Sequence, residues 1–214
     1  ELDIKCPDCS GEFGEPVDFN MMFSVDIGPK GDRTGFLRPE TAQGTYINFK
    51  REYRANRKRM PLGLATIGTA FRNEISPRQG VYRLREFIQA ELQIFFVPGL
   101  HDDVFEKEYE KIEDILLNVK RAGWDETKKI NVSELEVLEN FYLLHLAKMY
   151  EFYTSVMDLD EEDVRLRELS EDEKAFYNKI HFDIEVNFDS LGGWKEVSGL
   201  HYRSDYDLQK QEKE

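Results

Sequence analysis

Apolar and polar residues alternate along two stretches of the chain that are separated by a short turn. The stretches are LGLATIGTAFRNE (62–74) and VYRLREFIQAELQIFF (81–96), and the sequence between them contains Ser-Pro-Arg-Gln-Gly. Alternation with a period of two, broken by Pro and Gly, predicts a long antiparallel hairpin. The even-numbered residues of 81–96 are nearly all apolar, and we therefore expect that face of the hairpin to lie in a core.

The opposite face of this hairpin combines charge with an aromatic ring. On the second strand it carries Arg83, Arg85, Phe87, Gln89, Glu91 and Gln93. On the first strand, Gly68 and Ala70 leave space above the sheet. Arginines at the ends of both strands favour bidentate binding of an anion such as phosphate, and Phe87 suits stacking on a flat group. We therefore expect a nucleotide on this face; an ordinary solvent-exposed sheet face is the alternative.

The rest of the pattern predicts further strands and helices. We expect strands in 19–28, 181–188 and 194–202, and helices in 41–56, 101–123 and 134–157. The helices follow from apolar residues three and four apart and from capping signals at their ends. The segment 99–180 resembles a mostly helical insertion between two parts of one antiparallel sheet. The sequence therefore predicts an α+β fold divided into 1–98, 99–180 and 181–214.

Composition and charge narrow the class of protein. The hydrophobic fraction of 40% is typical of a globular protein, and no apolar run is long enough to predict a membrane span. The net charge of −14 is unevenly distributed, because residues 1–98 carry 14 Lys+Arg against 13 Asp+Glu and residues 99–214 carry 15 against 30. Within the first part, KREYRANRKR (50–59) holds six basic residues and one acid. This basic stretch contacts nucleic acid or is simply a solvated helix face; both interpretations stay open.

The only cysteines are Cys6 and Cys9, in the sequence CPDC. A pair this close is a poor structural disulfide, and an otherwise cysteine-free chain suits the reducing cytosol. CxxC is also half of a zinc knuckle, but the chain has no second half. Two interpretations stay open: a zinc half-site that is completed by residues outside this chain, and no metal.

The predicted hairpin resembles motif 2 of the class II aminoacyl-tRNA synthetases, which has FRxE on one strand and Arg…Glu-Phe on the next. Longer strings are similar to the homodimeric glycyl-tRNA synthetases: MMF…IGP (21–29), LRPETAQGTYINFKR (37–51), IGTAFRNEISPRQGVYRLREFIQAEL (67–92) and GWKEVSGLHYRSDYDL (193–208). The resemblance covers most of the chain and is weak in 1–18 and 99–180. It implies a class II antiparallel sheet flanked by helices.

The resemblance also implies a function and a set of site residues. The family activates glycine with ATP and Mg²⁺ to glycyl-adenylate and transfers it to the 3′ end of tRNA(Gly), as a cytoplasmic homodimer. Its ATP-binding positions fall on Arg72, Asn73, Glu74, Arg83, Leu84, Phe87, Glu196 and Val197, with Phe87 stacked on adenine and Glu196 able to hold Mg²⁺. Its glycine-binding positions fall on Glu40, Glu91 and Arg203.

The chemistry of this reaction suits these residue types. The carboxylate of glycine attacks the α-phosphorus of ATP while pyrophosphate leaves, and the nucleophile is already an anion. Catalysis then needs positioning and neutralisation of charge, which the resemblance assigns to Arg72 and Arg83. Three structural alternatives remain: Glu40 caps the following helix, Arg203 pairs with Asp205 or Asp207, and Glu196 is an exposed strand residue.

Two features separate this chain from a complete member of the family. His201 and Tyr202 stand where the family has a small residue and Asp or Asn, which affects the shape of the glycine pocket. The chain begins at Glu1 without Met and stops before the family's motif 3. We therefore expect a catalytic-core fragment with little or no activity by itself. The alternatives are a non-catalytic synthetase-like subunit and a different ATP-dependent amino-acid ligase.

Overall fold

The structure is a computed structural model of the 214-residue chain. It describes residues 5–15, 17–77, 80–100, 102–135 and 140–211. The chain divides into two compact units. The first unit consists of Glu1–Thr45 and Gly63–Gln93, and the second unit consists of Tyr46–Leu62 and Ile94–Glu214.

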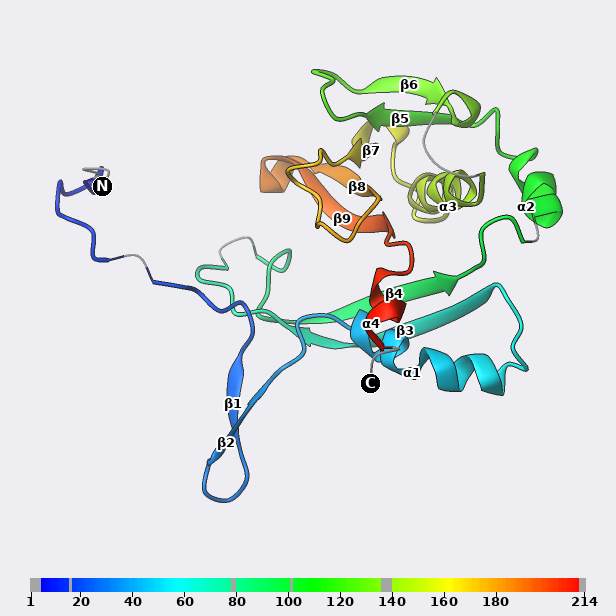
Figure 1. Cartoon of the computed structure of the whole chain (residues 1–214). Helices are drawn as coiled ribbons and strands as arrows, with labels where there is room; N and C mark the ends of the chain where they lie inside the picture. Colours follow the sequence, from blue (N-terminus) through cyan, green and yellow to red (C-terminus); the bar gives the residue numbers. More distant parts are fainter. Residues whose placement is uncertain (1–4, 16, 78–79, 101, 136–139, 212–214) are drawn as a thin grey trace. The chain divides into compact units, whose positions relative to one another are not determined.

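Two pairs of strands belong largely to the first unit (Figure 1). Strands β1 (Ser24–Ile27) and β2 (Arg33–Phe36) form an antiparallel hairpin, where the sequence predicted one strand followed by a loop. Strands β3 (Leu62–Phe71) and β4 (Glu86–Phe95) form a separate two-stranded sheet. The predicted strand pair is therefore confirmed, although the charged residues at its tip lie beyond the ends of the strands.

The two faces of the β3–β4 sheet differ from the prediction. The apolar face, which was expected in a core, is exposed: 76% of Ile67 and 78% of Ile88 are accessible to solvent, and Leu92 is exposed as well. The polar side chains of β4, such as those of Gln89 and Glu91, are half-buried. The prediction was wrong because a period of two shows only that the faces differ. Which face is covered depends on the segment that packs against it.

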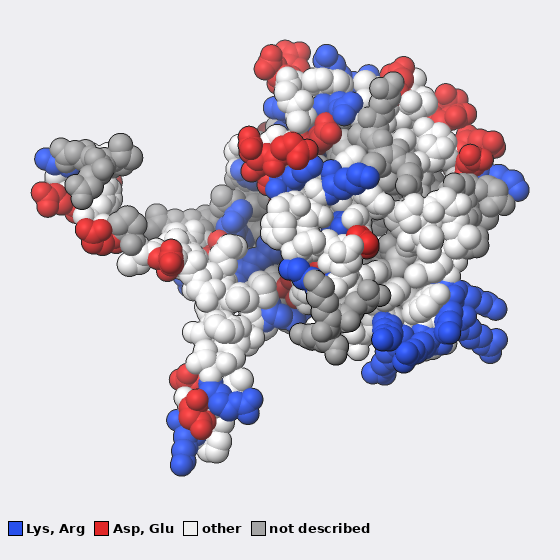
Figure 2. Space-filling model, in the orientation of Figure 1, with Lys and Arg blue, Asp and Glu red and all other residues white. Residues whose placement is uncertain are grey.

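Helix α1 (Ala42–Ala55) confirms the helix predicted over 41–56. It begins in the first unit and continues in the second. Lys and Arg side chains gather over this helix on the face of the molecule shown in Figure 2. Among the described residues, none of the helices is both long enough and apolar enough to cross a bilayer.

The second unit is built on a five-stranded sheet with the order β6-β5-β7-β8-β9. Its strands are β5 (Leu116–Lys120), β6 (Lys128–Asn131), β7 (Val164–Glu168), β8 (Ile180–Phe188) and β9 (Gly193–Tyr202). Strands β5 and β7 are parallel, and the other neighbours are antiparallel. Its helices are α2 (Asp102–Tyr109), α3 (Asn140–Glu151) with a π-helical continuation (Phe152–Val156), and α4 (Tyr206–Gln211). Short 3₁₀ turns occupy Val132–Glu134, Glu161–Asp163 and Asp189–Leu191.

The segment 99–180 is not mostly helical. The helix predicted over 101–123 ends at Tyr109, and Leu116–Lys120 forms strand β5. This stretch has apolar residues at spacings that fit a helix or a strand, and pairing with β6 and β7 decides the outcome. Because β5, β6 and β7 join the sheet of β8 and β9, this segment adds strands to the sheet. The boundaries at 98 and 180 stay a prediction.

The hydrophobic core lies between this sheet and α3. On β8 the residues Phe182 and Ile184 are fully buried, as is Leu146 on α3. The hydroxyl of Tyr142 donates a hydrogen bond to the carbonyl of Leu200 at 2.9 Å, and burial raises the pKa of this tyrosine. Within the helix predicted over 134–157, the apolar residues Phe141, Tyr142 and Leu146 lie on α3 and are buried. Leu135 is buried at the end of the preceding 3₁₀ turn, and Leu138 lies outside the described residues.

The opposite face of β8 is polar and also buried. Glu185 bonds to Arg165 on the neighbouring strand at 2.6 Å, and the Arg165 guanidinium lies 4.1 Å from the ring centroid of Trp194. Asp183 contacts His181 at 2.8 Å. Burying a carboxylate is costly unless a charged or hydrogen-bonding partner accompanies it. Glu185 has Arg165, and Asp183 lies 3.9 Å from the guanidinium of Arg167. The strand is therefore held from both faces.

Candidate active site

The segment Leu37–Thr41 lies across the β3–β4 sheet and fills space that the sequence suggested was open. The Arg38 Nε donates to the carbonyl of Thr69 at 2.7 Å, and the Arg38 carbonyl accepts from the amide of Phe71 at 2.9 Å. A Cβ at Gly68 would clash with the guanidinium of Arg38. The floor above Gly68 is therefore occupied by Arg38, which sits there because glycine has no side chain.

Thr41 ties this segment to the polar face of β4. Its amide donates to Gln89 Oε1 at 3.1 Å, and its hydroxyl donates to Glu91 Oε2 at 2.6 Å. Thr41 is buried, so both hydrogen bonds are shielded from water. The Thr41 hydroxyl, which a helix cap would use on α1, is thus used to orient Glu91. Glu40, the residue before Thr41, accepts a hydrogen bond from Gln43 at 3.1 Å.

Arg72 is fixed at the end of β3 by three contacts. Its amide donates to the carbonyl of Arg85 at 3.0 Å, and its Nε donates to the carbonyl of Pro39 at 3.1 Å. Its guanidinium carbon lies 5.3 Å from the ring centroid of Phe87, within cation–π range. The backbone contacts set the direction of the side chain, and the half-buried ring of Phe87 supports it.

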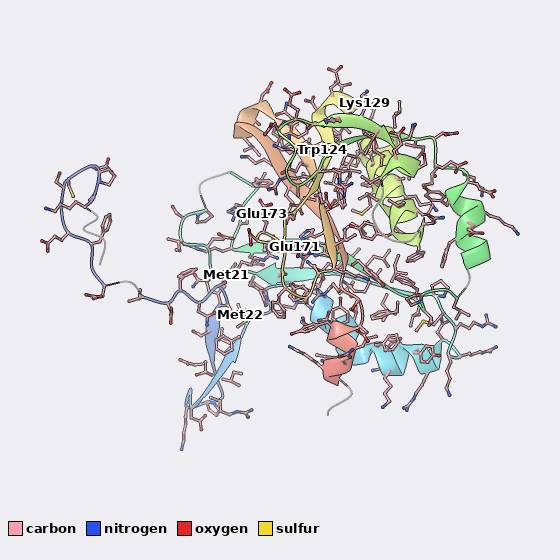
Figure 3. The ribbon with its side chains drawn as sticks, turned by 45° about the horizontal axis from the view of Figure 1, so that its top comes forward. Met21, Met22, Trp124, Lys129, Glu171 and Glu173 are labelled. Atoms are coloured by element: carbon pink, nitrogen blue, oxygen red, sulfur yellow. The ribbon has the colours of Figure 1, made fainter. Side chains whose placement is uncertain are left out.

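Asn73 connects the end of β3 to the segment before β1. Its amide donates to the carbonyl of Met21 at 2.7 Å, and its side-chain nitrogen donates to the carbonyl of Asn20 at 3.1 Å. Met21 and Met22 lie where the chain enters the β1–β2 hairpin (Figure 3). The side-chain amide of Asn73 therefore stabilises the contact between β3 and the segment before β1, which explains why an asparagine suits this position.

Glu74, Arg83 and Arg85 form the charged tip of the sheet. The Arg85 Nε donates to the carbonyl of Glu74 at 3.0 Å, so Arg85 closes the tip through the backbone. The Arg83 side chain is 51% exposed and lies 3.6 Å from a Glu74 oxygen, a loose ion pair in water. Leu84 is exposed. Of these side chains, Arg83 is the one that can move toward a ligand at low cost.

The first unit therefore brings together the predicted residues that belong to it: Glu40, Arg72, Asn73, Glu74, Arg83, Leu84, Phe87 and Glu91. Sequence analysis missed the organising roles of Arg38, Thr41 and Gln89. The string LRPET could have indicated these roles. Its arginine, glutamate and threonine stand directly before a helix, and a helix cap does not use all three side chains. The charges at the tip serve two purposes: Arg85 builds the turn and Arg72 is presented from it.

The second unit carries the remaining predicted residues on and after β9. Val197 packs against the hydrophobic core, and Glu196 is exposed opposite Glu185, at an irregularity in the β8–β9 pairing. Arg203 pairs with Asp207 through contacts of 2.8 and 2.9 Å, and its guanidinium lies 4.2 Å from the ring centroid of Tyr177. This geometry supports the alternative in which Arg203 has a structural role. The assignment of Arg203 to glycine stays a prediction.

Two histidines pair across β8 and β9 beside this region. The rings of His181 and His201 lie 3.8 Å apart between centroids, and the side-chain nitrogen of Asn178 lies 3.2 Å from His201 Nδ1 and 3.5 Å from His181 Nδ1. His201 is exposed as a residue, but its imidazole faces His181. Loss of water around the ring, together with repulsion from His181, lowers the pKa of His201 to about 4, while Asp183 opposes the shift.

We expect the free energy of unfolding to fall as pH falls from about 6.5, the ordinary pKa of histidine, toward about 4. In this range the unfolded chain binds a proton at His201 that the folded chain does not, so acid favours unfolding. Urea unfolding of the wild type and of His201→Gln between pH 4 and 7 measures the effect. His145→Gln is a second test, because burial also lowers the pKa of that histidine and its removal is expected to weaken the same pH dependence. An identical pH dependence in wild type and His201→Gln would contradict the assignment.

The cysteine pair forms a tight loop. The amide of Cys6 donates to the carbonyl of Gly11 at 3.0 Å, and the amide of Ser10 donates to the carbonyl of Cys6 at 2.8 Å. Hydrogen bonds from the backbone of Cys9 and Asp8 lower the pKa of the Cys6 thiol. Within the described ranges, no group of three or more His, Cys, Asp and Glu side chains is arranged to hold a metal ion. A zinc half-site at Cys6 and Cys9 stays a prediction.

The chain was compared with families and with curated proteins. The profile of the tRNA synthetase class II core domain (G, H, P, S and T) matches residues 23–210. The glycine–tRNA ligase of Thermococcus gammatolerans is 39% identical over 219 residues, which cover 100% of this chain and 38% of that protein. The glycine–tRNA ligase of Pyrococcus abyssi is 41% identical over 213 residues, which cover 97% of this chain and 37% of that protein. The chain thus spans well under half the length of these relatives.

Solved structures show the same fold at low sequence identity. A prolyl-tRNA synthetase from Cryptosporidium parvum, complexed with halofuginone and AMPPNP, matches with a TM-score of 0.56 at 16% identity, covering 89% of this chain and 31% of that chain. The same enzyme complexed with L-proline and AMP matches with a TM-score of 0.57 at 15% identity, covering 89% and 32%. The predicted α+β class II fold is therefore confirmed.

Proposed function

The chain belongs to the tRNA synthetase class II core domain family, and on this premise we propose that it is the catalytic core of a glycine–tRNA ligase. The proposed reaction is the ATP-dependent activation of glycine to glycyl-adenylate, followed by transfer to the 3′ end of tRNA(Gly). One observation carries the proposal most directly. Glu91, Arg72 and Phe87 are each held by specific contacts on one half-buried sheet face, next to Glu40. This set supplies two carboxylates for an ammonium group and an arginine with a ring for a nucleotide.

ATP is bound in this proposal by the tip of the β3–β4 sheet. Arg72 neutralises the α-phosphate, where charge develops when the glycine carboxylate attacks, and its backbone contacts remove the need to reorganise during the reaction. Arg83, which is loosely paired and exposed, turns to the distal phosphates. Phe87 supports the adenine, and Asn73, Glu74 and Leu84 complete the nucleotide contacts of the first unit. Val197 belongs to the second unit, and its assignment to ATP rests on the family resemblance. Glu196 supplies the single carboxylate through which Mg²⁺ is commonly bound together with phosphates.

Glycine is held in this proposal by its ammonium group, because it has no side chain to bind. Glu40 and Glu91 face the ammonium, and the hydrogen bond from Thr41 keeps Glu91 from rotating away. Arg203 belongs to the second unit, and its assignment to glycine rests on the family resemblance. A rigid carboxylate pair leaves little room at Cα, so the pocket rejects alanine by steric exclusion. The intact enzyme is proposed to act as a cytoplasmic homodimer on glycine, ATP and tRNA(Gly).

Calorimetry with non-hydrolysable aminoacyl-adenylate analogues tests the proposal. We expect this chain to bind the glycyl analogue at least about tenfold more tightly than the alanyl analogue, because one additional methyl group must fit against packed carboxylates. The alanyl analogue is the matched control, since it differs only in that methyl group. Equal binding of the two would indicate another amino-acid ligase. If neither analogue binds to the folded chain, and neither binds to the natural protein that contains it, the chain would be a non-catalytic relative.

A further inference from the structure

A basic surface covers the C-terminal half of α1 and the turn that follows it. We call it the basic strip, and it consists of Lys50, Arg51, Arg54, Arg57, Lys58 and Arg59. All six residues are exposed, in a chain whose net charge is −14. Figure 2 shows Lys and Arg side chains gathered in a blue area over α1, at the lower right of the view. Neighbouring charges of one sign repel one another, and a surface of this kind attracts ligands of the opposite sign.

The basic strip is almost free of internal partners. Arg51 lies 3.7 Å from Glu52, a weak pair in which the arginine side chain is 82% exposed. Within the described part of the chain, no other ion pair involves a residue of the strip. Elsewhere in the same unit, exposed cations do find carboxylates: Lys111 pairs with Glu108 and Lys129 pairs with Glu161. The shortage of partners is therefore a local property of the strip.

Aromatic packing fixes the opposite side of α1. The ring centroids of Phe49 and Phe95 lie 4.5 Å apart, and Tyr46 meets Phe95 edge to face at 5.9 Å. Phe49 also stacks on Tyr53 at 5.6 Å. The helix is thus held by one side while its charges project from another. A surface that is rigid before binding loses less entropy when a ligand attaches to it.

The turn after α1 presents the last three cations in a fixed conformation. Arg57 and Lys58 have φ angles of 54° and 57°, in the left-handed region that residues other than glycine seldom adopt. Hydrogen bonds from the Arg57 amide to the Arg54 carbonyl at 3.1 Å and from the Lys58 amide to the Tyr53 carbonyl at 2.8 Å close the helix. The helix dipole accounts for one or two cations at this end, and not for six within ten residues.

We propose that the basic strip binds the phosphodiester backbone of RNA. The inference rests on the proposed function, because it assigns a contact surface for the tRNA substrate. Four of the six cations are arginines, whose planar guanidinium groups match phosphate oxygens in pairs. The six cations extend from the C-terminal half of α1 through the turn that follows it, and such a row suits several phosphates better than a single anion. Backbone contacts of this kind position an RNA helix without reading its sequence.

The test measures the affinity of this chain for a fluorescent RNA hairpin by anisotropy, over a range of salt concentrations. The strip variant is Arg54→Gln, Arg57→Gln and Lys58→Gln together, and glutamine keeps the backbone preferences at the turn. The matched control is Lys107→Gln, Lys148→Gln and Lys210→Gln, which has the same net charge and changes exposed lysines elsewhere in the second unit. We expect the strip variant to bind roughly tenfold or more weakly and to lower the salt slope by about 2, while the control binds like the wild type.

The outcomes separate this inference from the proposed function. Equal RNA binding by the strip variant and the control would overturn the inference. A strip variant that keeps its RNA affinity but changes its oligomeric state on sedimentation would also overturn it, and would indicate an acidic protein surface as the partner. A DNA hairpin that binds as tightly as RNA would reduce the assignment to any phosphodiester and overturn its RNA part. Binding of the glycyl-adenylate analogue is measured on the same variants. RNA affinity that is unchanged in the strip variant, together with intact analogue binding, would contradict the inference and leave the proposed function standing.

Discussion

Replacing Arg72 with alanine is expected to weaken binding of the glycyl-adenylate analogue by roughly 10²–10³-fold, or about 2.7–4 kcal/mol, as for the loss of one preorganised donor in an active site. The side chain is held by the Pro39 carbonyl and by the ring of Phe87, so its direction is set before a ligand arrives. Alanine removes both the positive charge and the fork of donors. Isothermal titration calorimetry with the wild type and Arg72→Ala measures the loss.

Two further variants show whether the loss of affinity comes from the guanidinium group of Arg72. Arg72→Lys retains the charge and loses the planar fork, and we expect it to fall between wild type and alanine. Arg33→Ala removes an exposed arginine from β2 in the same unit and should leave binding unchanged. Full affinity in folded Arg72→Ala would mean that the phosphate is bound elsewhere, and the assignment of the β3–β4 tip as the nucleotide site would be wrong.

Replacing Phe182 with alanine is expected to lower the free energy of unfolding by about 3–5 kcal/mol. Phe182 lies on β8, an inner strand of the sheet, and its side chain is fully buried. Its ring lies 6.4 Å from that of Tyr142 on α3. The loss combines the transfer of a large apolar group with a cavity that a sheet packed on both faces cannot close. Urea denaturation followed by far-ultraviolet circular dichroism measures the change.

Phe176→Ala is the matched control for this substitution. Its side chain is 83% exposed, although its ring meets Tyr177 and Tyr206 edge to face. We expect a loss below about 1 kcal/mol, since little apolar surface leaves water at this position. Similar losses for the two phenylalanines would show that Phe182 is not in the core of the second unit.

The sequence correctly predicted those helices and strands for which the spacing of apolar residues and the capping or turn residues at the ends indicate the same structure. Helix α1 is flanked by Thr41 and Pro61, and the turn between β8 and β9 ends at Gly192, so the existence of these elements could be predicted. The stretch 116–120 could not, because the same apolar spacing fits a helix and only pairing with β6 and β7 decides. The prediction of which face of the β3–β4 sheet is buried was wrong for a similar reason, because burial depends on the segments that pack against the sheet.

The sequence predicted which residue types form the candidate site, but not the contacts that hold these residues in place. Arginines and carboxylates on one strand face indicated an anion site, and the family resemblance assigned their roles. Nothing local showed that Arg38 lies over Gly68 or that Thr41 bonds to Glu91, because both contacts join residues that are far apart in the sequence. The partner of Arg203 was one of two aspartates four or fewer residues away, and the structure selects Asp207.

The uneven distribution of the hydrophobic core has a consequence for how this protein should be assayed. The main cluster of buried apolar side chains lies between Ile112 and Val186, entirely in the second unit, whereas the first unit rests on a two-stranded sheet with an open apolar face. A melting curve dominated by the five-stranded sheet reports the second unit. A ligand that binds residues of the first unit stabilises that unit by mass action and can leave the main transition in place. An unchanged melting temperature is therefore no evidence against binding, and a probe placed in the first unit is the informative one.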